Sequence, residues 1–228
     1  RGEPKTRPPF PAVKGLFDRP TLLNNVETYA NITWIFNHGP EAYAAIGTET
    51  SKGTKVFALV GKVKRTGLVE VPMGATLRHL IYDIGGGVKG DRPFKAVQTG
   101  GPSGGCLTEK HLDLPIDFDS LLAAGSMMGS GGMIVMDEDN CMVSVAQFYL
   151  EFTVGESCGK CVPCRVGLGQ LQMMLEEVLD GTATDSTLQL IETTARVIRD
   201  TADCVIGSEA AEMVLRGVLG FREDYLEH

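Results

Sequence analysis

The chain has 228 residues, of which 43% are hydrophobic and 22% charged, enough apolar content for one large or two small domains with a buried core. Its net charge of −8 and pI near 5.0 leave no basic surface for phosphate backbones, which argues against nucleic acid as a partner. No apolar run reaches the roughly 18 to 20 residues that cross a bilayer, and no secretory leader is present. We therefore expect a cytoplasmic protein without direct membrane insertion.

The opening of the chain predicts an incomplete piece of structure. The segment Arg1 to Pro11 is polar and rich in proline, and no initiating Met precedes it. Apolar residues at helical spacing then predict a helix from Val26 to Asn37, with Asn25 as its N-cap. We expect the chain to be part of a longer polypeptide.

Residues 51–137 have the pattern of a small α+β domain. Two β-type runs, KVFALVGKV and GLVEV, precede a helix whose apolar face is formed by Leu77, Leu80, Ile81 and Ile84. The strand FKAVQT follows. This ββαβ order predicts one helix packed over a mixed sheet.

Three glycine-rich segments, GGGVKG, TGGPSGG and GSGG, raise the alternative of a nucleotide-binding loop. None has the form G-x-G-x-x-G or G-x4-G-K-[ST] between a strand and a helix. We therefore predict tight loops over Gly100 to Gly132, ending in the short strand MIVM. No HExxH pair or G-x-S-x-G elbow indicates a hydrolase.

Beyond Cys141 the pattern becomes helical, and residues 138–228 are predicted to form a four-helix bundle. The first helix carries a stripe expected in the core, formed by Val145, Phe148, Tyr149 and Phe152. The second has its stripe between Leu171 and Leu179. The third is predicted to begin with the capping box Ser186-x-x-Gln189, and the fourth to be capped by Ser208.

The segment GESCGKCVPCRVG brings Cys158, Cys161 and Cys164 together in the loop between the first two helices of the bundle. This C-x2-C-x2-C spacing suits three corners of an iron–sulfur cubane, which needs a fourth thiolate from elsewhere. Cys204 is the candidate, because the loop between the third and fourth helices returns to the same end of an up-down bundle. We therefore predict one [4Fe–4S] cluster on these four cysteines.

A zinc site with four thiolates is the alternative, and it would make the chain a metal-stapled interaction module without redox chemistry. Zinc sites usually pair two C-x2-C knuckles, whereas here three candidate ligands are contiguous and one is distant, which favours the cluster. Gly155 and Gly159 are expected to allow tight turns in the loop. Cys106 and Cys141 lack partners at ligand spacing and are interpreted as inert small hydrophobic residues.

Several segments, in this order, carry a family resemblance: RPPFPA, NNVET, TGGPSGG, ESCGKCVPCR, then Cys204 and GFREDYLEH. Together they resemble the NADH-binding flavoprotein subunit of respiratory complex I and the diaphorase subunits of NAD-linked or electron-bifurcating hydrogenases and formate dehydrogenases. The resemblance implies the tail of an FMN- and NADH-binding domain over residues 1–50. It further implies a ubiquitin-like β-grasp domain of the soluble-ligand-binding type over 51–137 and a four-helix-bundle [4Fe–4S] domain over 138–228.

The resemblance also implies roles for residues near the flavin. It places Asn24, Asn25 and Thr28 against the FMN phosphate and ribityl chain, and Phe10 against NAD(H). A helix N-terminus such as this one suits an anion, although simple helix capping is the alternative. The glycine-rich flavin loop of the family is not in this sequence.

For the full protein the resemblance implies an NADH:acceptor oxidoreductase in which hydride passes from NADH to FMN and single electrons then cross the cluster. Val205 and Ile206 match the segment between cluster and flavin. The implied partners are a thioredoxin-like [2Fe–2S] subunit and a larger iron–sulfur or hydrogenase-type subunit. The run EFTVGESCGKC is slightly more similar to hydrogenase-type diaphorases than to complex I. This fragment alone is not expected to turn over NADH.

Overall fold

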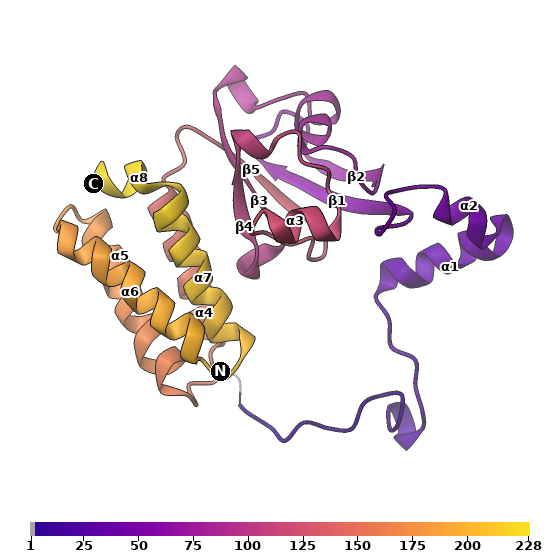
Figure 1. Cartoon of the computed structure of the whole chain (residues 1–228), viewed down its shortest axis with the longest axis horizontal. Helices are drawn as coiled ribbons and strands as arrows, with labels where there is room; N and C mark the ends of the chain where they lie inside the picture. The colour runs from indigo at the N-terminus through magenta and orange to yellow at the C-terminus, as the bar shows by residue number, and fades with distance from the viewer. Residues whose placement is uncertain (1–2) are drawn as a thin grey trace.

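The structure is a computed structural model that describes residues 3–228 (Figure 1). Its first part is an extended segment with a 3-10 turn, η1 (Leu16–Asp18), and two helices, α1 (Val26–His38) and α2 (Pro40–Ala44). The helix predicted from Val26 is confirmed, and Gly39, with a φ of 93°, ends it. The Asn25 side chain makes no capping hydrogen bond, so its predicted role as a side-chain cap is wrong.

Helix α1 is held to the rest of the molecule by one acidic side chain. Glu27 accepts a hydrogen bond of 2.8 Å from the backbone N–H of Val56, and its carboxylate also pairs with Lys55. The predicted apolar face contributes little, since Phe36 is 86% exposed and none of the residues of α1 is buried. Within the described chain, α1 therefore presents its apolar side chains to solvent.

A five-stranded mixed sheet occupies the middle of the molecule. Its strands are β1 (Thr54–Gly61), β2 (Gly67–Pro72), β3 (Phe94–Thr99), β4 (Gly105–Thr108) and β5 (Gly132–Asp137). They lie in the order β2-β1-β5-β3-β4, with β1 and β5 parallel and the other neighbours antiparallel. Side chains alternate between the two faces, so Phe57 and Leu59 of β1 both enter the core on one face.

The buried face of the sheet is covered by short helices. These are the π-helix η2 (His79–Ile84), the 3-10 turns η3 (Lys89–Asp91), η4 (Gly101–Ser103) and η5 (Glu109–His111), and α3 (Phe118–Ala123). The predicted helix with Leu77, Leu80 and Ile81 is confirmed, and all three side chains are fully buried. It ends in a wider π turn, in which the Gly85 N–H donates to the Leu80 carbonyl at 2.9 Å.

The prediction of loops alone between Gly100 and Gly132 is wrong, because this stretch contains β4 and α3. Strand β4 has only four residues and one large apolar side chain, Leu107, so its alternation is too short to detect. Helix α3 begins with a cap that the sequence does offer: the Asp117 carboxylate accepts from the Ser120 N–H at 2.7 Å.

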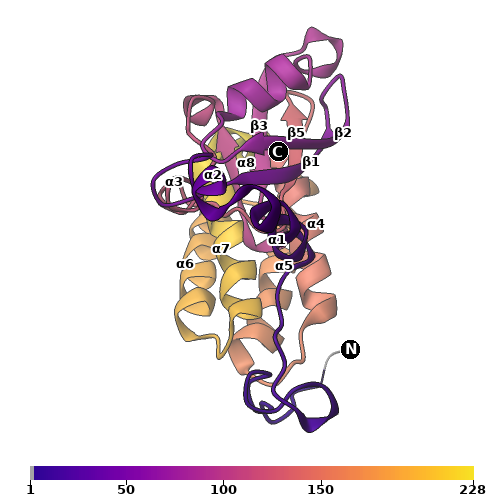
Figure 2. The ribbon, with the colours of Figure 1, turned by 90° about the vertical axis from the view of Figure 1, so that its right-hand side faces the viewer.

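The C-terminal region is helical. It comprises α4 (Met142–Glu156), the π-helix η6 (Pro163–Gly167), α5 (Leu168–Leu179), α6 (Asp185–Thr201), α7 (Val205–Gly220) and the short α8 (Arg222–Leu226). The four long helices close a ring in which α4 packs on α5, α5 on α6, α6 on α7, and α7 on α4. Figure 2 shows them side by side, with α4 and α7 reaching up to the sheet. One helix more than predicted, α8, follows them.

Three details of these helices differ from the predictions. Phe148 and Phe152 of α4 are 67% and 55% exposed, because the buried face of α4 is formed by smaller residues such as Ala146. Helix α6 is capped by Thr184, which forms a capping box with Thr187, and not by Ser186 with Gln189. Helix α7 begins at Val205, three residues earlier than Ser208 implied, and its N-cap residue is Cys204.

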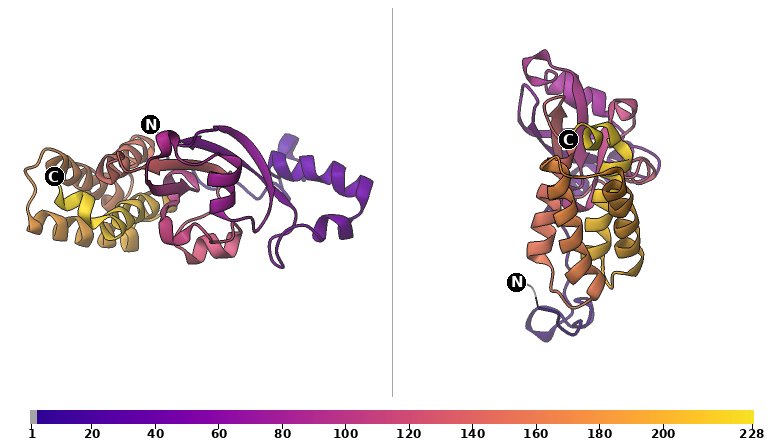
Figure 3. Two further views of the ribbon diagram at one scale, coloured as in Figure 1. Left: turned by 90° about the horizontal axis from the view of Figure 1, so that it is seen from above. Right: turned by 90° about the vertical axis from the view of Figure 1, so that its left-hand side faces the viewer.

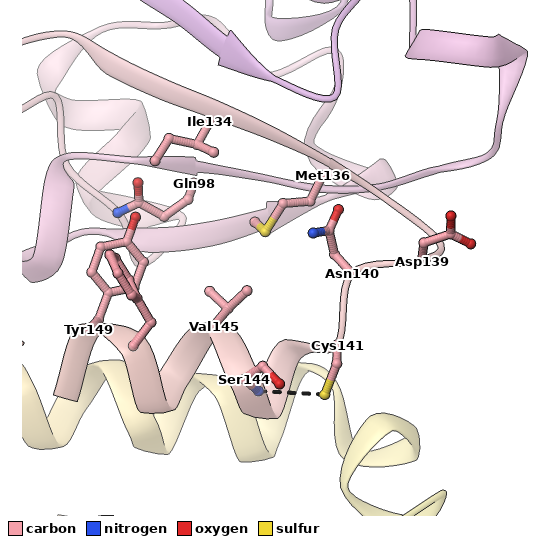
Figure 4. A pocket seen from close by; sticks show the side chains of 10 residues that line it. Gln98, Ile134, Met136, Asp139, Asn140, Cys141, Ser144, Val145 and Tyr149 are labelled. Atoms are coloured by element: carbon pink, nitrogen blue, oxygen red, sulfur yellow. Dashed lines mark hydrogen bonds between the residues drawn. The ribbon is translucent and has the colours of Figure 1, made fainter. Parts of the chain in front are cut away.

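Polar contacts join the sheet to the helical region. The Lys95 ammonium on β3 lies 2.5 Å from the Asp224 carboxylate, which also accepts from the Met142 N–H at 2.9 Å. Arg216 of α7 donates to the carbonyl of Gly125. A cavity of about 480 Å³ remains at this junction, where Ile134 and Met136 of β5 face α4 (Figure 4). Among residues 3–228, no helix has both the length and the apolar character needed to cross a bilayer.

Neighbouring leucines of α6 provide a matched test of the helical core. Leu188 is 3% exposed and Leu190 is 55% exposed. We expect Leu188→Ala to lower the free energy of unfolding by about 2–5 kcal/mol, because it leaves a cavity. Leu190→Ala should change it by no more than about 0.5 kcal/mol. Denaturant unfolding followed by circular dichroism measures both, and equal losses would show that α6 is packed differently.

Candidate metal centre

Two loops meet at the end of the helical region that lies farthest from α8. Helix α4 ends at Glu156 and the adjacent helix α7 begins at Val205, so the cysteine loop and Cys204 are brought to the same end (Figure 1). The topological argument for Cys204 predicted this meeting.

The closest point between the two loops is at Gly207, in the first turn of α7. A Cβ on Gly207 would lie 3.3 Å from Cys164 Cβ and 3.6 Å from Cys164 Sγ. The first turn of α7 therefore rests on Cys164, and only a residue without a side chain fits this contact. Cys204 lies one turn earlier, as the N-cap residue of the same helix.

The cysteine loop is ordered by its own polar groups. The Ser157 hydroxyl lies 3.0 Å from Cys164 Sγ and accepts a hydrogen bond of 3.1 Å from the Gly159 N–H. The Arg165 guanidinium donates to the carbonyls of Gly159 and Lys160 at 2.9 and 3.0 Å. Gly159 has a φ of 70°, which a residue with a side chain rarely adopts, so the predicted turn at this glycine is confirmed.

Gly155, in contrast, lies within α4, and the prediction that it forms a turn is wrong. The helix simply continues to Glu156 before the loop begins. Ser157 and Arg165 were not singled out as loop-shaping residues by sequence reasoning, although both stand beside the motif.

The four thiols differ in exposure. Cys164 is buried at 6% exposure, Cys161 is partly buried, and Cys158 and Cys204 are exposed. Burial raises the pKa of the Cys164 thiol, the Ser157 hydrogen bond opposes this, and the charges of Cys161, Cys204 and Cys158 raise it further. All four sulfurs are therefore near enough to interact electrostatically.

The chemistry of the donor set suits a soft metal group. Four thiols are the ligands of iron–sulfur clusters and of structural zinc. Within residues 3–228, however, no three His, Cys, Asp or Glu side chains converge closely enough to hold a single metal ion. The thiols are thus grouped, but in a wider arrangement than one ion requires.

The other two cysteines lie elsewhere. Cys106 is on β4, opposite Gln98 of β3, and burial raises its pKa to about 12. Cys141 is the N-cap residue of α4, where its Sγ accepts from the Ser144 N–H at 3.5 Å and lies 3.2 Å from His228 Nε2 (Figure 4). The cap position gives Cys141 a polar role that sequence reasoning did not predict.

The residues predicted near the flavin are all exposed. Asn25 and Thr28 line a hollow of about 510 Å³ between α1 and the sheet, which Asn24 and Phe10 do not line. Asn24 instead donates to the Tyr29 hydroxyl at 3.5 Å, and Phe10 is 67% exposed. The structure thus brings two of these four residues together.

Val205 and Ile206 lie beside the candidate metal centre and are 70% and 38% exposed. Ile206 lines a groove of about 310 Å³ together with Phe152 of α4 and Pro102 of the TGGPSGG loop. The sequence motif TGGPSGG therefore reaches the same end of the helices as the cysteines, a neighbour that spacing alone did not reveal.

Two families match parts of this chain. Residues 144–228 match the NADH-ubiquinone oxidoreductase-F iron-sulfur binding region, and residues 56–107 match the SLBB domain. The first match contains all four cysteines of the candidate centre.

Whole-chain comparisons give the same family of relatives. The chain is 53% identical over 228 residues to the NADP-reducing hydrogenase subunit HndC of Solidesulfovibrio fructosivorans, covering all of this chain and 46% of that protein. It is 40% identical over its full length to an NADH-quinone oxidoreductase subunit of Rhizobium meliloti, covering 54% of it. The chain spans about half the length of the curated relatives it matches.

A solved structure shares the fold over nearly the whole chain. The crystal structure of an NAD+-reducing [NiFe]-hydrogenase in the air-oxidized state is 30% identical and superposes with a TM-score of 0.82. The similarity covers 98% of this chain and 38% of that one.

The Gly207 contact can be tested without assuming which metal group is bound. A Cβ at this position would lie 2.7 Å from Ala202 Cβ as well as 3.3 Å from Cys164 Cβ, so Gly207→Ala forces α7 away from the cysteine loop. We expect the free energy of unfolding to fall by about 1–3 kcal/mol, as for other overpacked sites. Gly169→Ala in α5, where nothing lies within 4 Å, is the matched control and should raise stability by up to about 1 kcal/mol. Thermal unfolding of both variants measures this.

Proposed function

Because this chain corresponds to the C-terminal SLBB and iron–sulfur region of NADH dehydrogenase and hydrogenase diaphorase subunits, we propose that it is the electron-transfer part of such a subunit. The proposed ligands of one [4Fe–4S] cluster are Cys158, Cys161, Cys164 and Cys204. The observation that carries this proposal is the contact of the first turn of α7 with Cys164, since it joins the distant cysteine to the contiguous three.

The chain's own residues prepare the thiolates for this role. When bound, a [4Fe–4S] cluster supplies a one-electron redox centre. Arg165 and Ser157 hold the loop in shape, so the ligands need little rearrangement. Cys204 stands at the N-terminus of the 16-residue helix α7, whose positive end stabilises a thiolate.

The exposures of the four thiols suggest how electrons reach and leave the centre. Cys164 faces the helical core, which shields that side from water. Cys158 and Cys204 are exposed and lie next to Val205 and Ile206, which we propose to lie on the path from the flavin. The groove lined by Ile206 and Pro102 supports this assignment, because it leaves that side open to a neighbouring domain.

For the whole protein we propose oxidation of NADH by FMN, followed by electron transfer through this chain to partner subunits. The proposed partners are a thioredoxin-like [2Fe–2S] subunit and a larger iron–sulfur or hydrogenase-type subunit. Asn25 and Thr28, at the N-terminus of α1 and lining one hollow, support an FMN phosphate contact there. Asn24 and Phe10 are proposed to approach the flavin and NAD(H) from the same segment.

We propose the domain limits 1–50, 51–137 and 138–228, the second a ubiquitin-like β-grasp domain and the third a four-helix bundle. The strand order β2-β1-β5-β3-β4, with a parallel central pair and one long helical segment crossing the sheet, supports the β-grasp assignment. The closed ring of α4, α5, α6 and α7 supports the bundle.

Metal and sulfide analysis separates the cluster from a zinc staple. We expect the anaerobically purified chain to be brown and to contain about four irons with matching acid-labile sulfide, as one cubane requires. A colourless protein with one tightly bound zinc per chain would contradict the proposal and make the chain a structural module.

Cys204→Ser tests the ligand whose assignment depends on topology. We expect it to abolish the cluster or reduce it to a three-iron form, and to destabilise the helical region, because metal binding contributes to folding. Cys106→Ser and Cys141→Ser, at sites away from the four thiols, are the controls and should keep full iron content. Iron per chain and the low-temperature EPR spectrum after dithionite reduction measure this. An unaltered signal in Cys204→Ser, with loss in either control, would mean that the fourth ligand is misassigned.

A further inference from the structure

Helices α5 and α6 form the layer of the helical region that lies farthest from the sheet (Figure 3, right). Apolar side chains nevertheless point outward from both. Met173 on α5 is 56% exposed, and Leu190 and Val197 on α6 are each 55% exposed. In the described structure, no element of the chain covers them.

These side chains belong to two stripes that flank one groove. On the α5 side, successive members are three or four residues apart, as one helical face requires: Val162, Val166, Gln170, Met173 and Glu177. On α6 the stripe comprises Thr187, Leu190, Thr194 and Val197. The groove between the helices has a volume of about 600 Å³, and its walls include Met173 and Leu190. The α5–α6 groove therefore has the size and the apolar floor of a helix-binding groove.

The surroundings of the α5–α6 groove are acidic. From Val166 to Ala195 the sequence contains five acidic residues and no Lys or Arg. Of these, Glu192 pairs with Arg222 at 2.8 Å, whereas Glu177, Asp180 and Asp185 are exposed and have no ion pair among the described residues. The asymmetry extends to the whole region, since residues 138–228 hold 16 Asp and Glu against 6 Lys and Arg, a net charge of −10.

We propose that the α5–α6 groove binds a basic amphipathic helix of a partner protein. An apolar stripe on that helix would lie between Met173 and Leu190, and its Lys or Arg residues would face Glu177 and Asp185. A second copy of this chain is a poor occupant, because a symmetric pair would place two such acidic faces against each other.

The position of the groove gives the contact a purpose. The α5 stripe starts at Val162 and Val166, on either side of Cys164, so a helix in the groove ends beside the cysteine loop. This face is formed by α5 and α6, whereas Val205 and Ile206 belong to α7. The groove thus offers a docking face beside the candidate centre, and only its use in electron delivery rests on the proposed function.

The test uses the whole chain and a defined probe. The probe is a fluorescent helical peptide of about 18 residues, or five turns, with Leu along one face and Lys on its flanks. Fluorescence anisotropy should show binding that weakens as salt rises. A matched peptide with Glu in place of Lys should not bind measurably.

Variants on the groove separate a specific site from general attraction. Met173→Gln with Leu190→Gln, and separately Glu177→Lys with Asp185→Lys, should each weaken binding of the Lys peptide by about tenfold or more. Glu49→Lys with Glu138→Lys changes the net charge equally, at exposed positions outside the groove, and should weaken it far less. Circular dichroism confirms folding, which these exposed positions should not affect.

The outcomes decide between occupants. The proposal is wrong if the control double variant weakens binding as much as the groove variants do, or if the Glu peptide binds equally well. It is also wrong if wild type forms a dimer in light scattering that Met173→Gln with Leu190→Gln abolishes, since the occupant is then a second copy. Iron per chain, measured on the same samples, shows separately whether the cluster assignment holds, because peptide binding does not depend on it.

Discussion

The arrangement of the helical region depends on a single close contact, between the backbone at Gly207 and the side chain of Cys164. Because no side chain intervenes, α7 approaches the cysteine loop closely enough for Cys204 to join three thiols that are already contiguous. The ring of four long helices fixes which ends meet, and the hydrogen bonds of Ser157 and Arg165 fix the loop that is met. Local order and long-range topology thus act on the same few atoms.

The two halves of the chain differ in how they present charge and apolar surface. The sheet buries its large side chains under short helices, whereas the outer helices leave Met173 and Leu190 exposed within an acidic surround. Helix α1 is exposed in a different way, since only Glu27 connects it firmly to β1. The molecule therefore has two kinds of incomplete surface, one around α1 and one over α5 and α6.

Elements with strong periodicity were predictable from sequence, and short or context-dependent ones were not. The apolar stripe of α5 and the β-type runs of β1 and β3 are long enough to identify, whereas β4 carries one large apolar residue and α3 has six residues. The start of α7 was misplaced because Cys204 is not a common N-cap residue. The grouping of the cysteines was predictable, since three are contiguous and the helix count fixes the fourth. The environments of Asn24 and Phe10 were not, because both residues are exposed in this chain.

The contact between Lys95 and Asp224 has a consequence for how the protein is made, because the two residues are 129 positions apart. At about 5–20 residues per second, a ribosome reaches Asp224 on the order of 6 to 26 seconds after Lys95. During that interval the sheet can close its inner core, but its outer face, with Ala96 and Met136, still lacks α4 or α8 or both. The nascent chain thus carries an uncovered apolar face until its last helices emerge, which makes this the stage of its life when it most needs protection from aggregation.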